Sequence, residues 1–508
     1  MTFNTGQSCS IAGVLADWKV LLGLLIIIIT TSIRSYIRLS HVPGPLFQSI
    51  SSLGFLKTHL DGSPHSEILR WTQKYGPLVR VGPNSVITSD VKTVQRISGV
   101  KSPYSKGGWY RPFRFIKERD HSFSTVHEPS HTAFRSKIAA GFRGSAEMEQ
   151  AVDRQLRCLV ALIDRKYVSR ISSGDKTGFC QIMDIAAITH LFALDIVGDI
   201  TFGKAFGFLD EGYDFYGFLK WNKDFFSVAA TSAVLPTLAR AAQLWPFRGA
   251  LPKATDPAGL GKFIRHSEEV VGARYKEGPD GRRDLVGMFM KMGVTKDEAV
   301  NQLLVSVVAG TDSVATAIRR TVLFLTSNPR AYKILLSELD KAKADGLLSS
   351  PVQSSEARQL PYLQAVVREG LRIYPGGTPL AFKEVPIGGD MVAGYRLPAG
   401  TQVGMDVWGA LRNTQFWGED ADLFRPERWL NLAEARFSSM VECLDFQFGY
   451  GRYQCLGRPL VFMEMNKTLP ELLSRYEFAI VDPAHPADIK NAGFYLMNGF
   501  NVVVTVRA

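Results

Sequence analysis

Cysteine is scarce in this sequence, and the few cysteines are widely spaced. The five of them form no C-x-x-C pair; they are Cys9, Cys158, Cys180, Cys443 and Cys455. This spacing argues against a zinc site and a disulfide framework, and an odd number is typical of a reducing compartment. Charged residues are also few, at 21% of the 508 residues, whereas 46% are hydrophobic. Such a chain buries a large core, which excludes a disordered tail, a collagen-like repeat and a small disulfide scaffold.

Repeats, low-complexity tracts and long Ser- or Pro-rich linkers are absent after residue 45. Helical periodicity dominates residues 140–375, and short strand-like runs lie near 78–87, 391–403 and 478–506. These patterns predict one large domain that is mainly α with small β-sheets (α+β). The chain also lacks a G-x-G-x-x-G fingerprint after a strand and has no flavin module. Any electrons that its reaction needs must therefore come from a separate protein.

Positive charge exceeds negative charge, with 59 Lys and Arg against 48 Asp and Glu and a net charge of +11. An excess of this size suits a membrane surface, an acidic protein partner or nucleic acid. No nucleic-acid-binding module accompanies it, so we expect no nucleic-acid partner.

The first sixteen residues contain no Lys or Arg, and an apolar run follows at Val20–Ile33. Extended back to Ile11, this segment is long enough to span a bilayer. Arg34 and Arg38 come directly after the run. The positive-inside rule then places the N-terminus outside and the rest of the chain in the cytosol.

Proline and glycine mark a boundary after this segment, in the stiff, non-helical sequence His41-Val-Pro-Gly-Pro45. We therefore expect a single-pass membrane anchor with its flanks in residues 1–40, a hinge in 41–45 and a catalytic domain in 46–508. A cleaved signal peptide and a buried helix of the catalytic domain are the alternatives, although the basic start of a signal peptide is missing.

One cysteine stands in an unusual setting, the sequence Phe448-Gly-Tyr-Gly-Arg-Tyr-Gln-Cys-Leu-Gly457. Glycines on both sides allow the backbone to fold closely around the sulfur of Cys455. Backbone N–H groups aimed at the sulfur and the N-terminus of a predicted helix from Arg458 would stabilise a thiolate, the form that binds a metal. A tight turn with a buried free thiol is the alternative.

A capping box at Thr295-Lys-Asp-Glu298 opens a long apolar stretch that we predict to be helical. Small residues in its middle would let a flat ligand approach the backbone, and Gly310 permits local widening. Asp312 and Ser313 place an acid beside an alcohol, a pair suited to proton transfer. A polar interruption within a core helix is the alternative.

The cysteine loop resembles the ligand loop of the cytochrome P450 family, and four other segments match in the family's order over residues 131–457. They are His131-Thr-Ala-Phe-Arg135, Ala309-Gly-Thr-Asp-Ser-Val314, Glu369-Gly-Leu-Arg372 and Phe424-Arg-Pro-Glu-Arg-Trp429. The resemblance implies the cytochrome P450 fold and haem b, with Cys455 as the axial iron ligand and Phe448 beside the sulfur. It assigns Asp312 and Ser313 to oxygen activation, and the Glu-x-x-Arg pair with Arg428 to structure.

The same resemblance implies contacts to the haem propionates. His131 and Arg135 would present two donors one helical turn apart. Lys383 falls where relatives often carry arginine, although lysine cannot give the bidentate contact of arginine. Tyr453 stands where the family usually has arginine, so Arg452, one place earlier, is the candidate for that contact.

The resemblance implies a monooxygenase that activates O₂ with electrons from NADPH–cytochrome P450 reductase. The predicted anchor places it in the endoplasmic reticulum membrane. The cysteine loop also looks like fungal microsomal members such as the pisatin demethylase-like group. This likeness points to oxidation of a hydrophobic small molecule in secondary metabolism, such as a terpenoid, polyketide or alkaloid. A haem-thiolate isomerase or dehydratase without a reductase, and a non-catalytic haem sensor, are the alternatives; the acid–alcohol pair favours monooxygenation.

Aromatic residues are dense in the segment 104–115, which lies where the family places a variable loop over the haem. Its candidates for substrate contact, or for packing of the loop, are Trp109, Tyr110, Phe113 and Phe115. The segments 378–380 and 496–500 match two other regions that line the family's substrate pocket.

Overall fold

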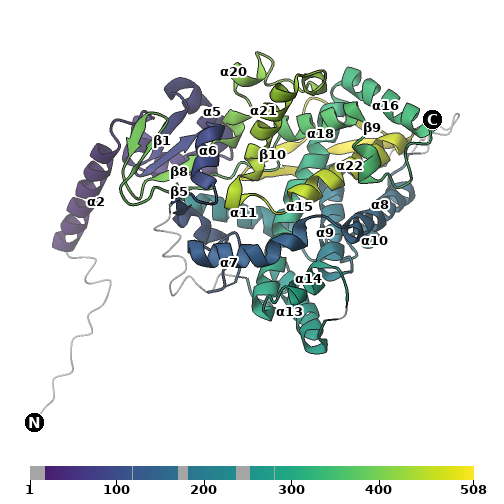
Figure 1. The fold of residues 1–508 in the computed structure, drawn as a ribbon, viewed down its shortest axis with the longest axis horizontal. Coiled ribbons are helices and arrows are strands. Elements are labelled where there is room, and N and C mark those ends of the chain that lie inside the picture. Colours follow the sequence, from purple (N-terminus) through teal and green to yellow (C-terminus); the bar gives the residue numbers. More distant parts are fainter. Residues whose placement is uncertain (1–17, 117, 170–180, 236–251, 280, 508) are drawn as a thin grey trace, which may run out of the picture.

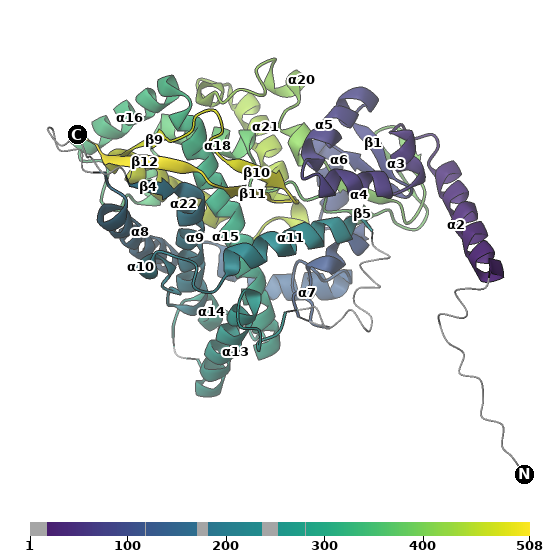
Figure 2. The same ribbon diagram turned by 180° about the vertical axis from the view of Figure 1, so that it is seen from behind.

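Helices form most of the protein in the computed structural model, which describes residues 18–116, 118–169, 181–235, 252–279 and 281–507 (Figures 1 and 2). The α-helices are α2 Trp18–Arg38, α3 Leu46–Ile50, α4 Leu53–Leu60, α5 Pro64–Tyr75, α6 Val91–Ser98, α7 Glu128–Ile138, α8 Ala146–Lys166, α9 Ile185–Phe202, α10 Phe208–Glu211, α11 Phe218–Val234, α13 Leu260–Glu277, α14 Leu285–Lys291, α15 Lys296–Thr326, α16 Pro329–Ala344, α17 Ser354–Ala357, α18 Pro361–Ile373, α19 Val407–Ala410, α20 Thr414–Trp417, α21 Glu434–Leu444 and α22 Arg458–Arg475. Short 3₁₀ turns are η1 Gly108–Phe113, η2 Ala139–Phe142, η4 Pro426–Trp429, η5 Asp445–Phe448 and η6 Gly451–Tyr453.

Small sheets lie beside the helices, as the sequence predicts. The largest has the order β1-β2-β8-β5-β3, with β2 and β8 parallel and the other neighbours antiparallel. Its strands are β1 Leu78–Gly82, β2 Ser85–Thr88, β8 Gln402–Met405, β5 Lys383–Glu384 and β3 Ser105–Lys106. The others are β4 Ile182–Asp184, β12 Asn501–Val506 and β9 Tyr476–Ile480 in one sheet, with the hairpins β10 Asp488–Asn491 to β11 Tyr495–Asn498 and β6 Asp390–Val392 to β7 Tyr395–Leu397. The three predicted strand regions are confirmed.

The central helix α15 runs through the protein and packs along α9 (Figure 1). It begins with the predicted capping box, in which Thr295 and Glu298 satisfy each other's backbone N–H groups. The helix is continuous through Gly310, the position at which the sequence would permit a local widening. A Cβ at Gly310 would lie 2.9 Å from Cγ2 of Val197 on α9. Glycine here permits the two helices to approach each other.

Within the described residues, α9 is the one helix whose length and composition would allow it to cross a membrane. It is 94% buried inside the protein. A helix that is apolar on all sides and enclosed by neighbours is a core helix.

The predicted hinge at 41–45 is held against the catalytic domain. The backbone N–H of Arg80 donates to the carbonyl of Pro43 at 2.8 Å, and a Cβ at Gly44 would lie 2.3 Å from the Arg80 carbonyl oxygen. The Arg80 guanidinium also donates to the carbonyls of Ser35 and Tyr36 at the end of α2. The chain after α2 is therefore packed on β1. Residues 1–17 of the predicted anchor segment lie outside the described residues.

Candidate active site

The cysteine loop lies between η5 and α22 and closes on itself. The backbone N–H of Cys455 donates to the carbonyl of Phe448 at 2.6 Å. Gly449 and Gly451 have φ of 68° and 57°, a region that favours glycine, and a Cβ at Gly451 would lie 2.3 Å from the Ser98 carbonyl oxygen. The loop conformation therefore requires the glycines that surround the cysteine.

The sulfur of Cys455 is set up as an acceptor of hydrogen bonds. Burial raises the pKa of its thiol, whereas the backbone N–H groups of Gly457 and Arg458 and the charge of Arg135 oppose this rise. Cys455 nevertheless keeps exposed surface, whereas Cys443 is buried. On balance the pKa is raised, so a thiolate at this position requires a positive partner, such as a metal ion, beside the sulfur.

Two residues in the middle of α15 keep exposed surface. Ala309 is exposed whereas Val308 and Thr311 are buried, and Ser313 is half-buried. The Ser313 hydroxyl donates to the Ala309 carbonyl at 2.7 Å, within the helix. Ala309 and Ser313 therefore share a face of α15 that neighbouring side chains do not fully cover.

Asp312 does not lie on the partly exposed face of α15 that carries Ser313. Its carboxylate is fully buried and faces α9 and α11, where it contacts Nε2 of His190 and accepts from Nδ2 of Asn222 at 2.5 Å. Burial raises the pKa of Asp312, but His190, Arg319 and Asn222 outweigh it, so the pKa lies below its ordinary value. The predicted acid and alcohol are adjacent in sequence but face different sides of α15.

Basic side chains from four segments converge on Glu128 of α7; we call this set the Glu128 cluster. Its basic members are Lys106, His131, Arg135, Lys383 and Arg452. The hydroxyl of Tyr453 donates to Glu128 at 2.5 Å, and its ring stacks on His131 with centroids 5.4 Å apart. The structure thus brings together the four residues that the sequence assigned to propionates.

The electrostatics of the Glu128 cluster are unbalanced. Burial lowers the pKa of Lys383 to about 7 and that of His131 to about 3, and neighbouring cations add to the effect at His131. Nδ1 of His131 has no hydrogen-bond partner among the described residues. A buried set of cations around one carboxylate fits a ligand with two more carboxylates, which a haem edge provides.

Lys106 was missed by the sequence analysis. It pairs directly with Lys383 in the β3–β5 ladder, and like charges at such a position are unfavourable. Its Nζ is buried and donates to the carbonyls of Ser122 and Phe123 at 2.8 and 2.9 Å. Burial and the charge of Lys383 lower its pKa well below the ordinary value. Its strand, β3, has only two residues, and so short a strand leaves no pattern in the sequence that would identify Lys106.

Arg452 has a second role that the sequence did not predict. Its Nη2 donates to the carbonyls of Ser102 and Tyr104 at 2.7 and 2.5 Å, and its Nε lies 3.4 Å from Glu128. Arg452 therefore mainly fixes the segment 102–104, with one nitrogen facing the cluster.

The Glu-x-x-Arg pair forms the predicted structural network. Glu369 accepts from Arg372 at 2.8 and 2.9 Å and from Arg428 at 2.9 Å, all fully or nearly fully buried. Trp429 Nε1 also donates to Glu369 at 2.9 Å. We call these three charged residues the Glu369 network.

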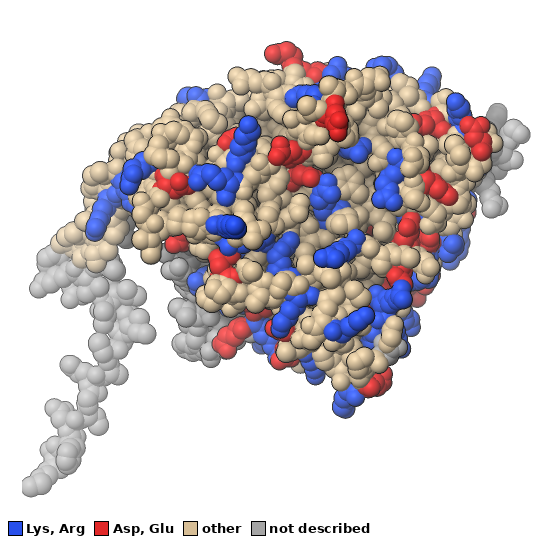
Figure 3. Space-filling view, viewed as in Figure 1, with Lys and Arg blue, Asp and Glu red and all other residues tan. Residues whose placement is uncertain are grey.

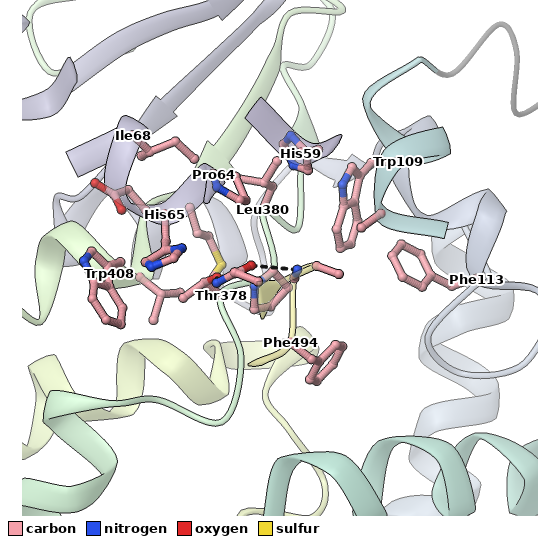
Figure 4. A pocket seen from close by; sticks show the side chains of 18 of the residues that line it. His59, Pro64, His65, Ile68, Trp109, Phe113, Thr378, Leu380, Trp408 and Phe494 are labelled. Atoms are coloured by element: carbon pink, nitrogen blue, oxygen red, sulfur yellow. Dashed lines mark hydrogen bonds between the residues drawn. The ribbon is translucent and has the colours of Figure 1, made fainter. Parts of the chain in front are cut away.

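A small apolar pocket of about 30 Å³ lies between α4, α5, η1 and the β10–β11 turn (Figure 4). Trp109, Phe113, Thr378 and Phe494 line it. For Trp109 and Phe113 the sequence left open substrate contact or packing of the loop, and their position at a pocket agrees with the first. The other two aromatic candidates are used elsewhere: the Tyr110 hydroxyl accepts from Lys383 at 2.6 Å, and Phe115 packs on His121 and Phe225. The hairpin turn that reaches the pocket is 492–494, not the expected segment 496–500.

Comparison with known proteins identifies the family. The model described as "Cytochrome P450" matches residues 42–500. The chain is 34% identical over 471 residues to "Cytochrome P450 monooxygenase aba1" of Botryotinia fuckeliana, and 36% identical over 480 residues to "Cytochrome P450 monooxygenase ABA1" of Pyricularia oryzae. Each alignment covers 92% of this chain and 92% of the relative. "Cytochrome P450 monooxygenase cicH" of Emericella nidulans is 29% identical over 487 residues, covering 93% of this chain and 95% of the relative.

The chain therefore belongs to the cytochrome P450 family. It is a cytochrome P450 monooxygenase, and membership implies a haem-thiolate cofactor, O₂ and an electron-donating partner.

Proposed function

We propose that Cys455 is the thiolate ligand of the haem iron and that the Glu128 cluster binds the haem propionates. The observation that carries this assignment is the pairing of two complementary sites. The sulfur of Cys455 accepts backbone N–H groups, and a buried set of basic side chains surrounds the single carboxylate of Glu128. We place the haem cavity between this sulfur and the exposed face of α15 at Ala309 and Ser313. Haem bound there supplies the redox and oxygen chemistry.

The chain's own residues would then handle protons and orientation. Ser313 presents a hydroxyl on the half-exposed face of α15, and Asp312 holds a buried carboxylate on a neighbouring face of the same helix turn. A proton taken up by Asp312 would pass to the side of Ser313, which is the general acid–base role of the pair. Arg135 and His131 would hold the propionate edge and so fix the orientation of the ring.

The decisive test is the CO difference spectrum of the dithionite-reduced protein, with Cys455→Ser beside the wild type. We expect a strongly red-shifted Soret band in the wild type and its loss in the variant. Cys443→Ser is the matched control, because Cys443 is buried elsewhere, and it should leave the band in place. A red-shifted band that survives in Cys455→Ser would refute the ligand assignment.

We infer that the substrate is a hydrophobic small molecule of fungal secondary metabolism. The support is the fungal origin of the relatives, together with the aromatic side chains of Trp109, Phe113 and Phe494 at the pocket in Figure 4. Burial also lowers the pKa of His65, which lines this pocket, to about 4, so it carries no charge at neutral pH. The likeness of the cysteine loop to the pisatin demethylase-like group supports the same inference. Spectral binding titrations should favour uncharged terpenoid, polyketide or alkaloid scaffolds over charged ones.

We propose that NADPH–cytochrome P450 reductase binds over α7 and α22, on the cysteine side. Lys and Arg side chains are spread over this face (Figure 3), which carries a hollow of about 500 Å³. Arg143, Arg358, Arg368 and Arg458 line the hollow and suit an acidic partner.

Charge reversal tests this docking surface. Arg143→Glu with Arg358→Glu should raise the KM for reductase about tenfold and reduce its salt dependence, because steering by complementary charge is lost. Lys276→Glu with Lys291→Glu, at the ends of α13 and α14, is the control matched for the change of net charge. Equal effects of both variants would count against docking at the hollow.

We further propose a single-pass membrane protein of the endoplasmic reticulum with a cytosolic catalytic domain. Helix α2 has 21 residues, about 31 Å at 1.5 Å per residue, which matches a bilayer core. Exposed apolar residues continue onto α3 and α4, where Leu46, Phe47, Leu53 and Leu60 are 59–67% exposed. The full-length protein should resist extraction by alkaline carbonate, and deletion of residues 2–38 should weaken this. Complete extraction of the full-length protein would contradict the anchor.

A further inference from the structure

Side chains from three helices hold Asp312, and all of these side chains lie outside the segments that match the cytochrome P450 family. His190 of α9 contacts one carboxylate oxygen through Nε2, and Asn222 of α11 donates to the other. Arg319, two turns along α15, lies 4.0 Å from the carboxylate. All four side chains are at least nine-tenths buried, so this is a closed polar network in the core.

The hydrogen-bond geometry around Arg319 indicates the tautomer of His190. Nη1 of Arg319 lies 3.0 Å from Nδ1 of His190, and a guanidinium can only donate hydrogen bonds. We therefore assign Nδ1 as the acceptor, because two N–H groups do not face each other at this distance. The Ala186 carbonyl is the more distant partner, 3.2 Å from Nδ1 and 3.5 Å from Nη1. The proton of a neutral His190 is thus on Nε2, which donates to Asp312.

Arg319 is itself fixed in place. Its Nη2 donates to the Thr316 hydroxyl at 2.8 Å and to the Tyr495 carbonyl at 3.0 Å. Burial lowers its pKa to about 10, still far above neutrality, so it remains a cation. A neutral histidine between a fixed cation and a carboxylate keeps the carboxylate ionised and directed away from the haem cavity.

A hollow of about 200 Å³ connects this network with the surface. Asp312, His190 and Asn222 form its floor, and the exposed residues Lys223 and Asn498 lie at its rim. The volume holds several water molecules in contact with polar groups. The charged groups that face Asp312 from the surrounding elements are His190 and Asp184 of the α9 side, Lys223 of α11 and Arg319 of α15.

We propose that His190 is a positioning residue for Asp312, held in its Nε2-protonated tautomer by Arg319, and that the hollow under Lys223 is the route by which protons reach Asp312. This inference rests on the proposed role of Asp312 in proton delivery. Water in the hollow relays a proton from bulk solvent: an O–H bond of the water breaks as the O–H bond on Asp312 forms, and the water regains a proton from the solvent. Asp312 returns to the carboxylate when its proton leaves toward Ser313. His190 keeps its own proton throughout.

Infrared titration of the haem-loaded protein tests the role of His190. Asp312→Asn identifies the carbonyl band of protonated Asp312. We expect His190→Leu to move the midpoint of this band upward by about one pH unit or more, a tenfold change. His190→Gln can donate to Asp312 and accept from Arg319, so it should keep the wild-type midpoint. A midpoint unchanged in His190→Leu would overturn the proposal.

Nitrogen NMR of the ¹⁵N-histidine-labelled, reduced CO-bound wild type tests the tautomer directly. The His190 signal is assigned as the one that is missing in His190→Gln, a variant that keeps both hydrogen bonds. Between pH 6 and 8 we expect this signal to be that of a neutral ring protonated on Nε2. An imidazolium or an Nδ1-protonated ring would overturn the proposal even if His190→Leu does not fold.

Filling the hollow tests the route. Leu219→Trp should lower the fraction of NADPH electrons recovered in product about threefold or more, with the Asp312 midpoint and the substrate-binding spectrum unchanged. Unchanged coupling would exclude the hollow as the route. Failure of the underlying function is distinguishable, because full coupling in Asp312→Asn would reject Asp312 as a proton carrier whatever the His190 variants show.

Discussion

Two buried charge clusters of this protein, both built around one glutamate, differ in how completely they are balanced. In the Glu369 network, one carboxylate accepts from two arginines, and those arginines donate further to backbone carbonyls such as that of Leu411. In the Glu128 cluster, one carboxylate faces several cations whose pKa values are lowered. The first is complete without a ligand, whereas the second needs further negative charge. Charge imbalance in a buried site is thus what separates a ligand site from a structural one.

The largest expected effect is on the Glu369 network. Glu369→Gln leaves Arg372 and Arg428 buried without their counter-charge, which should cost about 3–5 kcal/mol, a large share of a typical stability. We expect little folded, haem-loaded protein, measured by the yield of the CO-reactive form and by urea unfolding. A stability close to that of the wild type would show that the network is dispensable.

The next effect concerns pH and Lys383. In the haem-free protein, burial lowers the pKa of Lys383 from 10.5 to about 7. Between these values the folded protein binds fewer protons than the unfolded one, so stability rises with pH. From pH 7 to 9 we expect the free energy of unfolding of the haem-free protein to rise by about 2 kcal/mol. Lys383→Met should abolish this rise, and bound haem should suppress it because its propionates keep Lys383 charged. Urea midpoints at the two pH values measure it; an equal rise in Lys383→Met would assign it to other groups.

Glu128→Gln is the matched counterpart of Glu369→Gln and should be much milder in the haem-loaded protein. There the propionates supply the negative charge that Glu128 provides otherwise, so we expect a loss of no more than about 1 kcal/mol. The haem-free protein should lose more, because its cations then have no carboxylate partner. Loss of haem-loaded protein comparable to that in Glu369→Gln would contradict the comparison.

The smallest effect is expected at Tyr453, which replaces the usual arginine. Tyr453→Phe removes the hydrogen bond to Glu128 but keeps the stacking on His131, at a cost of about 1 kcal/mol. Retention of haem during dilution should fall by less than tenfold. Complete loss of haem would mean that the hydroxyl itself binds the cofactor.

Much of the fold and of the site could be predicted because the relevant signals are local. The capping box at Thr295, the glycines around Cys455 and the strand-like runs each depend on neighbours in sequence. Lys106 and the hydrogen bonds of Arg452 could not be predicted, because a two-residue strand and a contact across 350 residues leave no local pattern. The packing role of Gly310 could not be predicted either, since the Val197 side chain that it accommodates lies on α9.

The sequence by itself determined the family, the cysteine that faces the cavity and the long helix that carries Asp312 and Ser313. Those features depend on the order and spacing of residues that are neighbours in the sequence, so they can be identified before the chain folds. Only the tertiary structure decided that Asp312 is buried while Ser313 is partly exposed, and that His190 and Arg319 hold the carboxylate. Charge and tautomer depend on which buried groups come within about 4 Å of each other, and helices from distant parts of the chain set those distances.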